Sequence, residues 1–183
     1  MKDEHAIVLD YLEHGRPGGP SKPVAQVVGT ENFNLLEVVP QEDVRLNAGD
    51  EVYIGEGDRD EVRYIKGKIT THELTQTAKS ELEYVLEDLV EENEDDFVEF
   101  FNEAEPLTPR QHALELLPSI GEKHMWEILD ERDDNGDFAS LDDIKERVDL
   151  LPDPRGILVK RLMQELSGDE KHYLFTVPPK DRD

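Results

Sequence analysis

The sequence contains no cysteine in 183 residues. This absence excludes disulfides, thiolate metal ligands and cysteine nucleophiles. It also has no apolar run near the ~18 residues that a membrane-spanning helix needs. The first residues are acidic where a secretory signal would be basic. We therefore expect a cytoplasmic protein with no membrane segment.

Basic residues are scarce: 20 Lys and Arg stand against 45 Asp and Glu, a formal net charge of -25. Acidity is spread over the whole chain and peaks in residues 71–106, which hold thirteen acids and one base. Because the acids alternate with regular apolar patterning, most of the chain is expected to fold. Two interpretations remain open. The acids hydrate a protein from a salt-rich cytosol, or they form a surface that mimics nucleic acid or binds a basic partner.

Residues 1–70 favour a small β-domain. Five short runs rich in Val, Ile, Leu and Tyr (HAIVLDYL, PVAQVVG, FNLLEVV, EVYIG and VRYIKGKI) are separated by turn-forming stretches such as GRPGGPSKP. Five strands at this spacing predict a closed or nearly closed barrel of the OB or SH3 kind.

The pattern changes to helical spacing after Thr70. Thr70 and Glu73 have the spacing of a capping box, and Asn93 is placed to begin a second helix that buries phenylalanines. We predict an acidic helical connector over 71–106.

An all-α domain is expected over 107–168, followed by an extended tail over 169–183. Thr108 and Pro109 are typical of a helix start. In the tail, KHYLFTVPP is expected to dock and Lys180–Asp183 to fray. The fold class is therefore multi-domain α+β: an OB-like β-barrel, a helical connector and a helical domain.

The segment LELLPSIGEKHMWEIL resembles the helix-hairpin-helix motif of nucleic-acid-binding proteins. In that motif a tight glycine-containing loop and the start of the next helix point N–H groups at a phosphate, without reading bases. Ile120 is expected to anchor the loop, Gly121 to be the glycine that the turn requires, and Lys123 to assist as a cation. Ser119 stands where the motif usually has its first glycine. A purely structural hairpin is the alternative.

Further candidate contacts surround this hairpin and the predicted barrel. His124 and Trp126 can stack on a base, although a tryptophan in such a helix is more often part of the core. Arg63 and Lys66 differ by an odd step, so a flat strand would not place both on one face. The predicted nucleic-acid-binding residues are Ser119, Ile120, Gly121, Lys123, His124, Arg155, Lys160, Arg161, Arg63, Lys66 and Lys68.

Other motifs do not predict a site. Residues 131–142 imitate a calcium loop, but an interhelical turn fits better, since the first ligand position is Glu and the last is Asp. The six histidines lack metal-ligand spacing. Gly55 and Gly57 are not followed by a phosphate-loop sequence. With no nucleophile beside a matched base, we expect neither an enzyme nor a metal or other cofactor.

Three segments, NFNLLEVVP, VYIGEG and LPSIGEKHMWEIL, carry a wider resemblance. Over essentially its whole length the chain resembles an archaeal family of unknown function, described as nucleotide- or RNA-binding. The resemblance implies an OB-like barrel joined to a helix-hairpin-helix domain, and a ribosomal or rRNA-linked role rather than DNA repair. It implies no reaction.

Two functions follow as hypotheses. The first is a monomeric, non-catalytic accessory protein that binds RNA, with rRNA or a ribonucleoprotein as the expected partner. The second is an adaptor whose acidic surface binds a basic partner such as a ribosomal protein. Exposed hairpin residues with unpaired N–H groups would favour the first, and a covered hairpin the second. Because a charge of -25 repels RNA at low salt, affinity for naked nucleic acid is expected to be weak.

Overall fold

The computed structural model describes residues 1–179, and the predicted fraying of Lys180–Asp183 lies outside them. The chain forms two compact units. The first holds Met1–Leu86 and the described part of Met163–Asp183, and the second holds Glu87–Leu162. The division falls inside two helices, α1 (Gln76–Glu92) and α5 (Pro154–Leu166). The predicted boundaries at residues 70, 106 and 168 stay a prediction.

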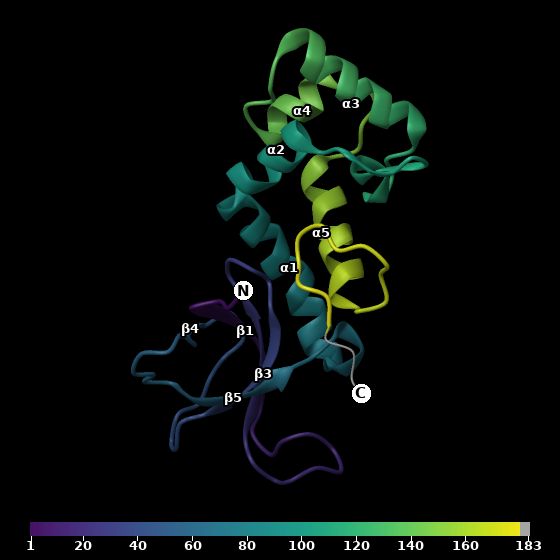
Figure 1. Cartoon of the computed structure of the whole chain (residues 1–183). Helices are drawn as coiled ribbons and strands as arrows, with labels where there is room; N and C mark the ends of the chain where they lie inside the picture. The colour runs from purple at the N-terminus through teal and green to yellow at the C-terminus, as the bar shows by residue number, and fades with distance from the viewer. Residues whose placement is uncertain (180–183) are drawn as a thin grey trace. The chain divides into compact units, whose positions relative to one another are not determined.

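All five predicted strands are present in the first unit (Figure 1): β1 (His5–Leu12), β2 (Val24–Gly29), β3 (Leu35–Pro40), β4 (Glu51–Tyr53) and β5 (Val62–Lys68). They form one sheet in the order β4-β1-β2-β3-β5, and every pair is antiparallel. Because β4 and β5 are the two edges and do not pair within residues 1–179, the sheet is a curled half-barrel. The closed or nearly closed barrel expected from the sequence is not formed.

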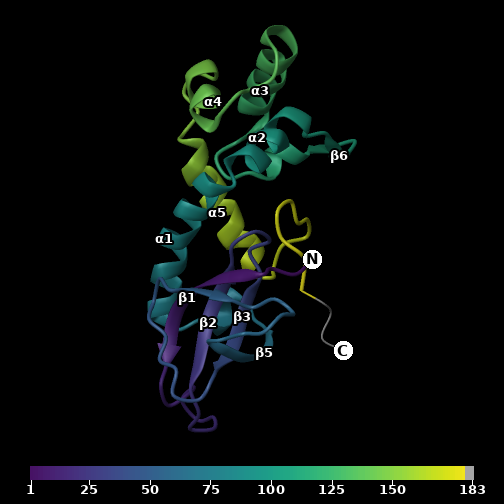
Figure 2. The same cartoon turned by 90° about the vertical axis from the view of Figure 1, so that its left-hand side faces the viewer.

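The sheet buries side chains on both faces. Its concave side holds the main apolar cluster, which includes Val8, Val27, Val38, Val52 and Val62. The first turns of α1 lie beside the sheet in both views (Figures 1 and 2) and bury Ala78, Leu82 and Leu86. Since β2 is central and covered on both sides, all six of its residues are buried.

The start of α1 differs from the predicted capping box. Thr70 and Glu73 do form the box, but it begins a single 3-10 turn, η1 (Thr71–Glu73). The long helix begins after Thr75, whose hydroxyl accepts the N–H of Ala78 at 3.0 Å. Gln26 fixes this start from β2, because its side chain accepts the N–H of Thr75 and donates to the Glu73 carbonyl. The long helix thus begins after this 3-10 turn, at a position where a residue of the sheet contacts the chain.

Asp3, just before β1, organises the turn between β2 and β3. Its side chain is buried, and its carboxylate accepts four hydrogen bonds of 2.6 to 3.1 Å, from the N–H groups of Glu31, Asn32 and Asn34 and from the Asn34 amide. Gly29 must lack a side chain here, because a Cβ would lie 1.8 Å from the Asp3 carboxylate.

The C-terminal segment docks, as predicted, through a second buried carboxylate. Glu165 at the end of α5 accepts the N–H groups of Leu174, Phe175 and Thr176 and the hydroxyl of Thr176, all at 3.0–3.1 Å. The segment runs beside the end of α5 in Figure 1. Lys68 also donates to the Val177 carbonyl, so the segment is held by polar contacts to side chains, and it pairs with no strand among residues 1–179.

The second unit begins with α2 (Glu94–Glu103), which follows Asn93 as predicted and buries Phe97 and Phe101. The helix predicted from Thr108 is wrong. Thr108 and Pro109 instead lie in a tight hairpin between β6 (Pro106–Thr108) and β7 (Gln111–His112). A hydroxyl residue followed by proline favours a β-turn as well as a helix start, and here the turn is formed. The remaining elements are η2 (Ala113–Leu116), α3 (Glu122–Asn135) and α4 (Leu141–Arg147).

None of the helices within residues 1–179 is long and apolar enough to cross a membrane.

Candidate nucleic-acid interface

The predicted hairpin lies between η2 and α3. Leu117 ends η2, and its carbonyl accepts the N–H of Ile120 at 3.2 Å. Ile120 is 4% exposed, which confirms it as the apolar anchor of the loop. Gly121 is the N-cap of α3, and its carbonyl accepts the N–H of Met125.

The residue that takes the unusual backbone conformation is Ser119, not Gly121. Ser119 has φ 66°, in the left-handed region that favours glycine. Gly121 is extended, with φ -96°, and no atom lies within 4 Å of where its Cβ would be. The expectation that Gly121 is the glycine required by the turn is therefore wrong. The first glycine position of the motif is the strained one, and serine occupies it here.

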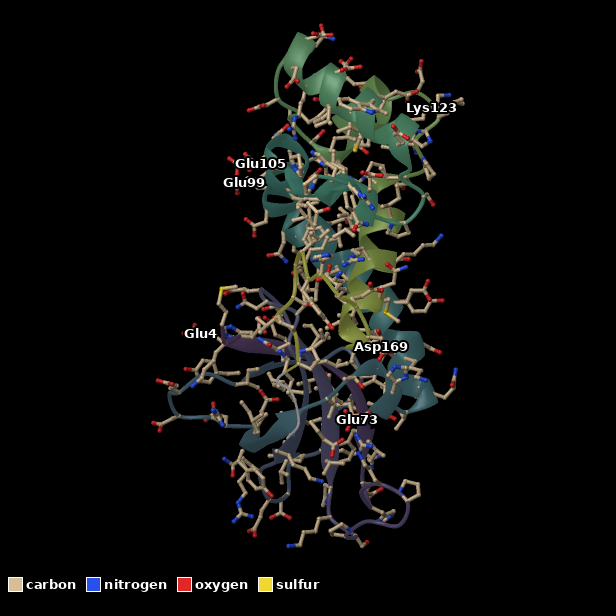
Figure 3. The ribbon with its side chains drawn as sticks, turned by 45° about the vertical axis from the view of Figure 1, so that its right-hand side comes forward. Glu4, Glu73, Glu99, Glu105, Lys123 and Asp169 are labelled. Atoms are coloured by element: carbon tan, nitrogen blue, oxygen red, sulfur yellow. The ribbon has the colours of Figure 1, made fainter. Side chains whose placement is uncertain are left out.

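The hairpin presents backbone donors to solvent. Ser119 and Gly121 are exposed, and among residues 1–179 no acceptor meets either of their N–H groups. The first N–H groups of α3 follow directly, as they do at any helix start. Lys123 points away from the ribbon in Figure 3 and is 77% exposed, with Glu127 at 3.9 Å. Exposed backbone donors thus lie next to one exposed cation on the first turn of α3.

Two rings follow on α3. His124 is partly buried and turned toward Glu127, with Nδ1 3.4 Å from the carboxylate. Trp126 is 53% exposed. The core position that is more common for such a tryptophan is not adopted, so its ring is accessible for stacking.

The three cations predicted on α5 differ in accessibility. Arg155 lies within 4.0 Å of the carboxylates of Glu91, Glu94, Asp142 and Asp153, and its hydrogen bond to Asp142 raises the pKa of the guanidinium. Arg161 is 3% exposed and donates to the Leu116 carbonyl at 3.1 Å, so it supports the hairpin from inside. Lys160 alone is exposed and has no ion-pair partner among the described residues. Arg155 and Arg161 therefore interact with groups of the protein itself.

The connection between α4 and α5 lacks comparable donors. Asp153 precedes α5, and its carboxylate accepts the N–H of Arg155 at 3.1 Å. A carboxylate of the chain itself thus satisfies this N–H group at the start of α5.

The loop that imitates a calcium site is closed by a side chain. The Arg147 guanidinium donates to the carboxylates of Glu131 and Asp143 and to the carbonyls of Glu131, Gly136 and Asp137. Its centre lies 4.5 Å from the Phe138 ring centroid. The oxygens that a cation would need thus surround an internal guanidinium. No cluster of potential metal ligands occurs within residues 1–179.

His112 fixes the start of η2 and so the approach to the hairpin. It is 7% exposed, its Nδ1 accepts the Leu114 N–H at 3.0 Å, and Glu115 accepts the His112 N–H. Burial, followed by the charge of Arg132, lowers the pKa of this imidazole. Since Nδ1 must be unprotonated to accept, the folded state favours neutral His112.

We expect the stability of the protein to decrease below about pH 6.5, the ordinary pKa of histidine. In that range unfolded chains bind a proton at His112 that folded chains exclude, so stability rises with pH up to that value. His112→Asn keeps a capping acceptor and removes the titration. Urea unfolding at several pH values would test this. An equal decrease between pH 6.5 and 5 in both proteins would contradict it.

The basic residues of β5 belong to the other compact unit. Lys66 lies 3.3 Å from the Glu37 carboxylate, and Lys68 donates to the Val177 carbonyl at 3.2 Å. Burial lowers the pKa of Lys68 below its usual value, although Asp3 acts in the opposite direction. Arg63 is exposed and has no polar partner among residues 1–179.

The glycines at 55 and 57 serve Tyr53. A Cβ at Gly55 would lie 2.4 Å from the Tyr53 hydroxyl, and the Gly57 N–H donates to that hydroxyl at 3.0 Å. These glycines accommodate an aromatic ring rather than a phosphate.

The comparisons with known proteins bear on this arrangement as a whole. A family model described as "Protein of unknown function (DUF655)" matches residues 2–177. The chain belongs to the DUF655 family. It is 45% identical over 175 residues to "Uncharacterized protein MJ0038" of Methanocaldococcus jannaschii, covering 94% of this chain and 79% of that protein.

A solved DUF655 structure closely resembles that of this chain. The crystal structure of Af1531 from Archaeoglobus fulgidus matches with a TM-score of 0.86 and 40% identity, over 96% of this chain and 100% of that one. This agreement supports the α+β fold, with its curled five-stranded antiparallel sheet and, within residues 1–179, five α-helices. The archaeal family suggested by the sequence is thus confirmed.

Proposed function

We propose that this DUF655 protein is a non-catalytic RNA-binding accessory protein. Its hairpin Leu117–Gly121 and the first turn of α3 would contact the phosphate backbone, in the manner of a helix-hairpin-helix motif. The observation that supports this most directly is the exposed bend with free N–H groups at Ser119 and Gly121, next to the exposed ammonium of Lys123. The apolar anchor Ile120 holds the bend in place.

The negative charge of the protein limits the kinds of RNA that it is expected to bind. Glu122 and Glu127 lie in the same first turns as Lys123, so long-range attraction to a polyanion is absent. Main-chain N–H groups act at hydrogen-bond range, which remains effective when salt screens repulsion to about 3 Å at 1 M. A preformed surface, such as folded rRNA in a ribonucleoprotein, fits this better than free RNA, because several such short contacts must form together.

The proposal is tested with Gly121→Val combined with Lys123→Glu. The extended backbone and open space at Gly121 accommodate a β-branched side chain, so the fold is expected to persist. The valine covers the N–H groups and the glutamate reverses the charge, so association with structured rRNA fragments in about 1 M KCl should weaken at least tenfold. Filter binding measures this affinity, and crosslinking with sequencing identifies the RNA bound in cells.

Lys145→Glu on α4 is a suitable control, since it makes the same charge change at an exposed site away from the bend. Equal affinities of the double variant and the control would reject the hairpin as the contact.

An adaptor role is the second proposal, favoured by one observation. The part of α1 in the second unit carries Glu87, Asp88 and Glu91, all exposed. Such a helix face would suit a basic protein segment. Co-purification of a ribosomal protein that is lost on charge reversal of α1, but not of the hairpin, would favour this role.

A further inference from the structure

β5 is the one strand of the sheet with several bases and no acid, and its pairing with β3 is irregular. Val62 lies opposite Pro40 and Tyr64 opposite Val39, so Arg63 is an extra residue between them. Ile65 lies opposite Val38 and Gly67 opposite Glu37, so Lys66 is a second extra residue. These are two β-bulges, which change the direction of side chains at sheet edges.

The bulges decide which face each side chain occupies. Val38 and Val62 belong to the concave core, and Ile65 packs against it. The alternate residues Glu37 and Val39 therefore lie on the convex face. Arg63 and Tyr64 together oppose Val39, and Lys66 and Gly67 together oppose Glu37, so Arg63, Tyr64 and Lys66 share the convex face. The contact between Lys66 and Glu37 agrees with this assignment. The flat-strand expectation that Arg63 and Lys66 lie on opposite faces is thus wrong.

The side chains around Glu37 carry a local positive charge, in contrast to the acidic chain as a whole. Glu37 is 3% exposed and pairs with Arg16, whose Nε lies 2.8 Å away, as well as with Lys66. Burial raises the pKa of Glu37, but the Arg16 hydrogen bond and charge outweigh it and lower the pKa below its ordinary value. Arg16 and Lys66 thus pair with one carboxylate, and Arg63 lies on the same strand as Lys66 without a polar partner among residues 1–179, so these four side chains together carry a charge of +2 on a chain of -25.

Tyr64 completes the site. Its ring is 49% exposed on an edge strand, between Arg63 and Lys66. A half-exposed ring between two cations is the arrangement by which proteins hold an unpaired base and its adjoining phosphates. A duplex does not offer a base face to such a ring, because its bases are stacked inside the helix.

We propose that Arg63, Tyr64 and Lys66 form a binding site for an unpaired RNA segment, in which Tyr64 stacks on a base and the two cations bind phosphates. The site rests on the proposed function only in that its ligand is RNA. It lies in the other compact unit from the hairpin and uses a different recognition mode.

The test compares Tyr64→Leu with Tyr64→Phe in the full chain. Fluorescence anisotropy with labelled oligouridylate in about 1 M KCl measures the affinity. Leucine retains apolar bulk but has no ring face, so the affinity should fall about tenfold, since stacking contributes ~1–3 kcal/mol per base. Phenylalanine retains the ring and should bind like the wild type. Arg63→Ala should weaken binding and reduce the salt slope by about 1.

Tyr84→Leu is the matched control, because Tyr84 is more exposed than Tyr64 but lies among acids on α1. Circular dichroism confirms that each variant is folded. Equal binding by Tyr64→Leu and Tyr84→Leu, or no binding of oligouridylate by the wild type, would overturn the inference. Loss of structured rRNA binding in the hairpin variant alone would leave the proposed function standing without this site, and loss of oligouridylate binding in Tyr64→Leu alone would leave the site standing without the hairpin.

Discussion

Replacing Asp3 with alanine is expected to destabilise the protein by about 3–4 kcal/mol. The substitution removes the acceptor of four hydrogen bonds and leaves the N–H groups of Glu31, Asn32 and Asn34 without partners. These groups lie in the turn that joins two paired strands, and Asn34 is buried there, so the loss of their acceptor weakens the pairing of β2 with β3. The cost therefore falls on the folded state as a whole.

Urea unfolding followed by far-UV circular dichroism measures this loss. Glu4→Ala serves as the control, because Glu4 is next to Asp3 in the sequence and its side chain is exposed. Gly29→Ala should be destabilising for the same reason, since its Cβ would displace the Asp3 carboxylate. If Asp3→Ala and Glu4→Ala unfold at the same urea concentration, the turn is held by other contacts.

Replacing Glu165 with alanine is expected to release the C-terminal segment. The carboxylate is 2% exposed and accepts four hydrogen bonds from Leu174, Phe175 and Thr176. Because this segment pairs with no strand among residues 1–179, it can detach and expose its N–H groups to water. A local opening is therefore expected in place of global unfolding.

Hydrogen exchange measures this release. Loss of about 3 kcal/mol of local stability corresponds to roughly 100-fold faster exchange of the three amides. Gln164→Ala, at an exposed position on the same helix, should leave their exchange unchanged. Retained protection in Glu165→Ala would mean that the segment is held by its side chains instead.

At the hairpin, the local sequence predicts some features of the structure but not others. Ile120 was predictable as the anchor because an apolar residue between two turn residues has few other roles. The strained position was not, since Ser119 and Gly121 both suit a turn and only the path from η2 to α3 decides which one takes a positive φ. The exposure of Trp126 likewise depends on which face of α3 is covered.

The accessibility of the basic residues on α5 could not be predicted from the sequence. Arg155, Lys160 and Arg161 are close in the sequence and look alike as candidate phosphate contacts. In the structure, Arg155 is surrounded by carboxylates and Lys160 is exposed. Arg161 is buried and donates to a carbonyl 45 residues away in the sequence. The partners of a long charged side chain are the groups that the fold places near it. Its own segment of the sequence does not specify those groups.

The amino-acid order alone determined the five strands, the absence of thiol chemistry and the anchor of the hairpin, because periodic burial and turn residues are encoded within a few positions. Tertiary structure decided that the sheet stays open, that β5 bulges twice to bring Arg63, Tyr64 and Lys66 to one face, and which cations remain free. These outcomes depend on strand register and on ion pairs between distant residues, such as Glu37 and Lys66, 29 positions apart. Only the folded chain brings such groups together.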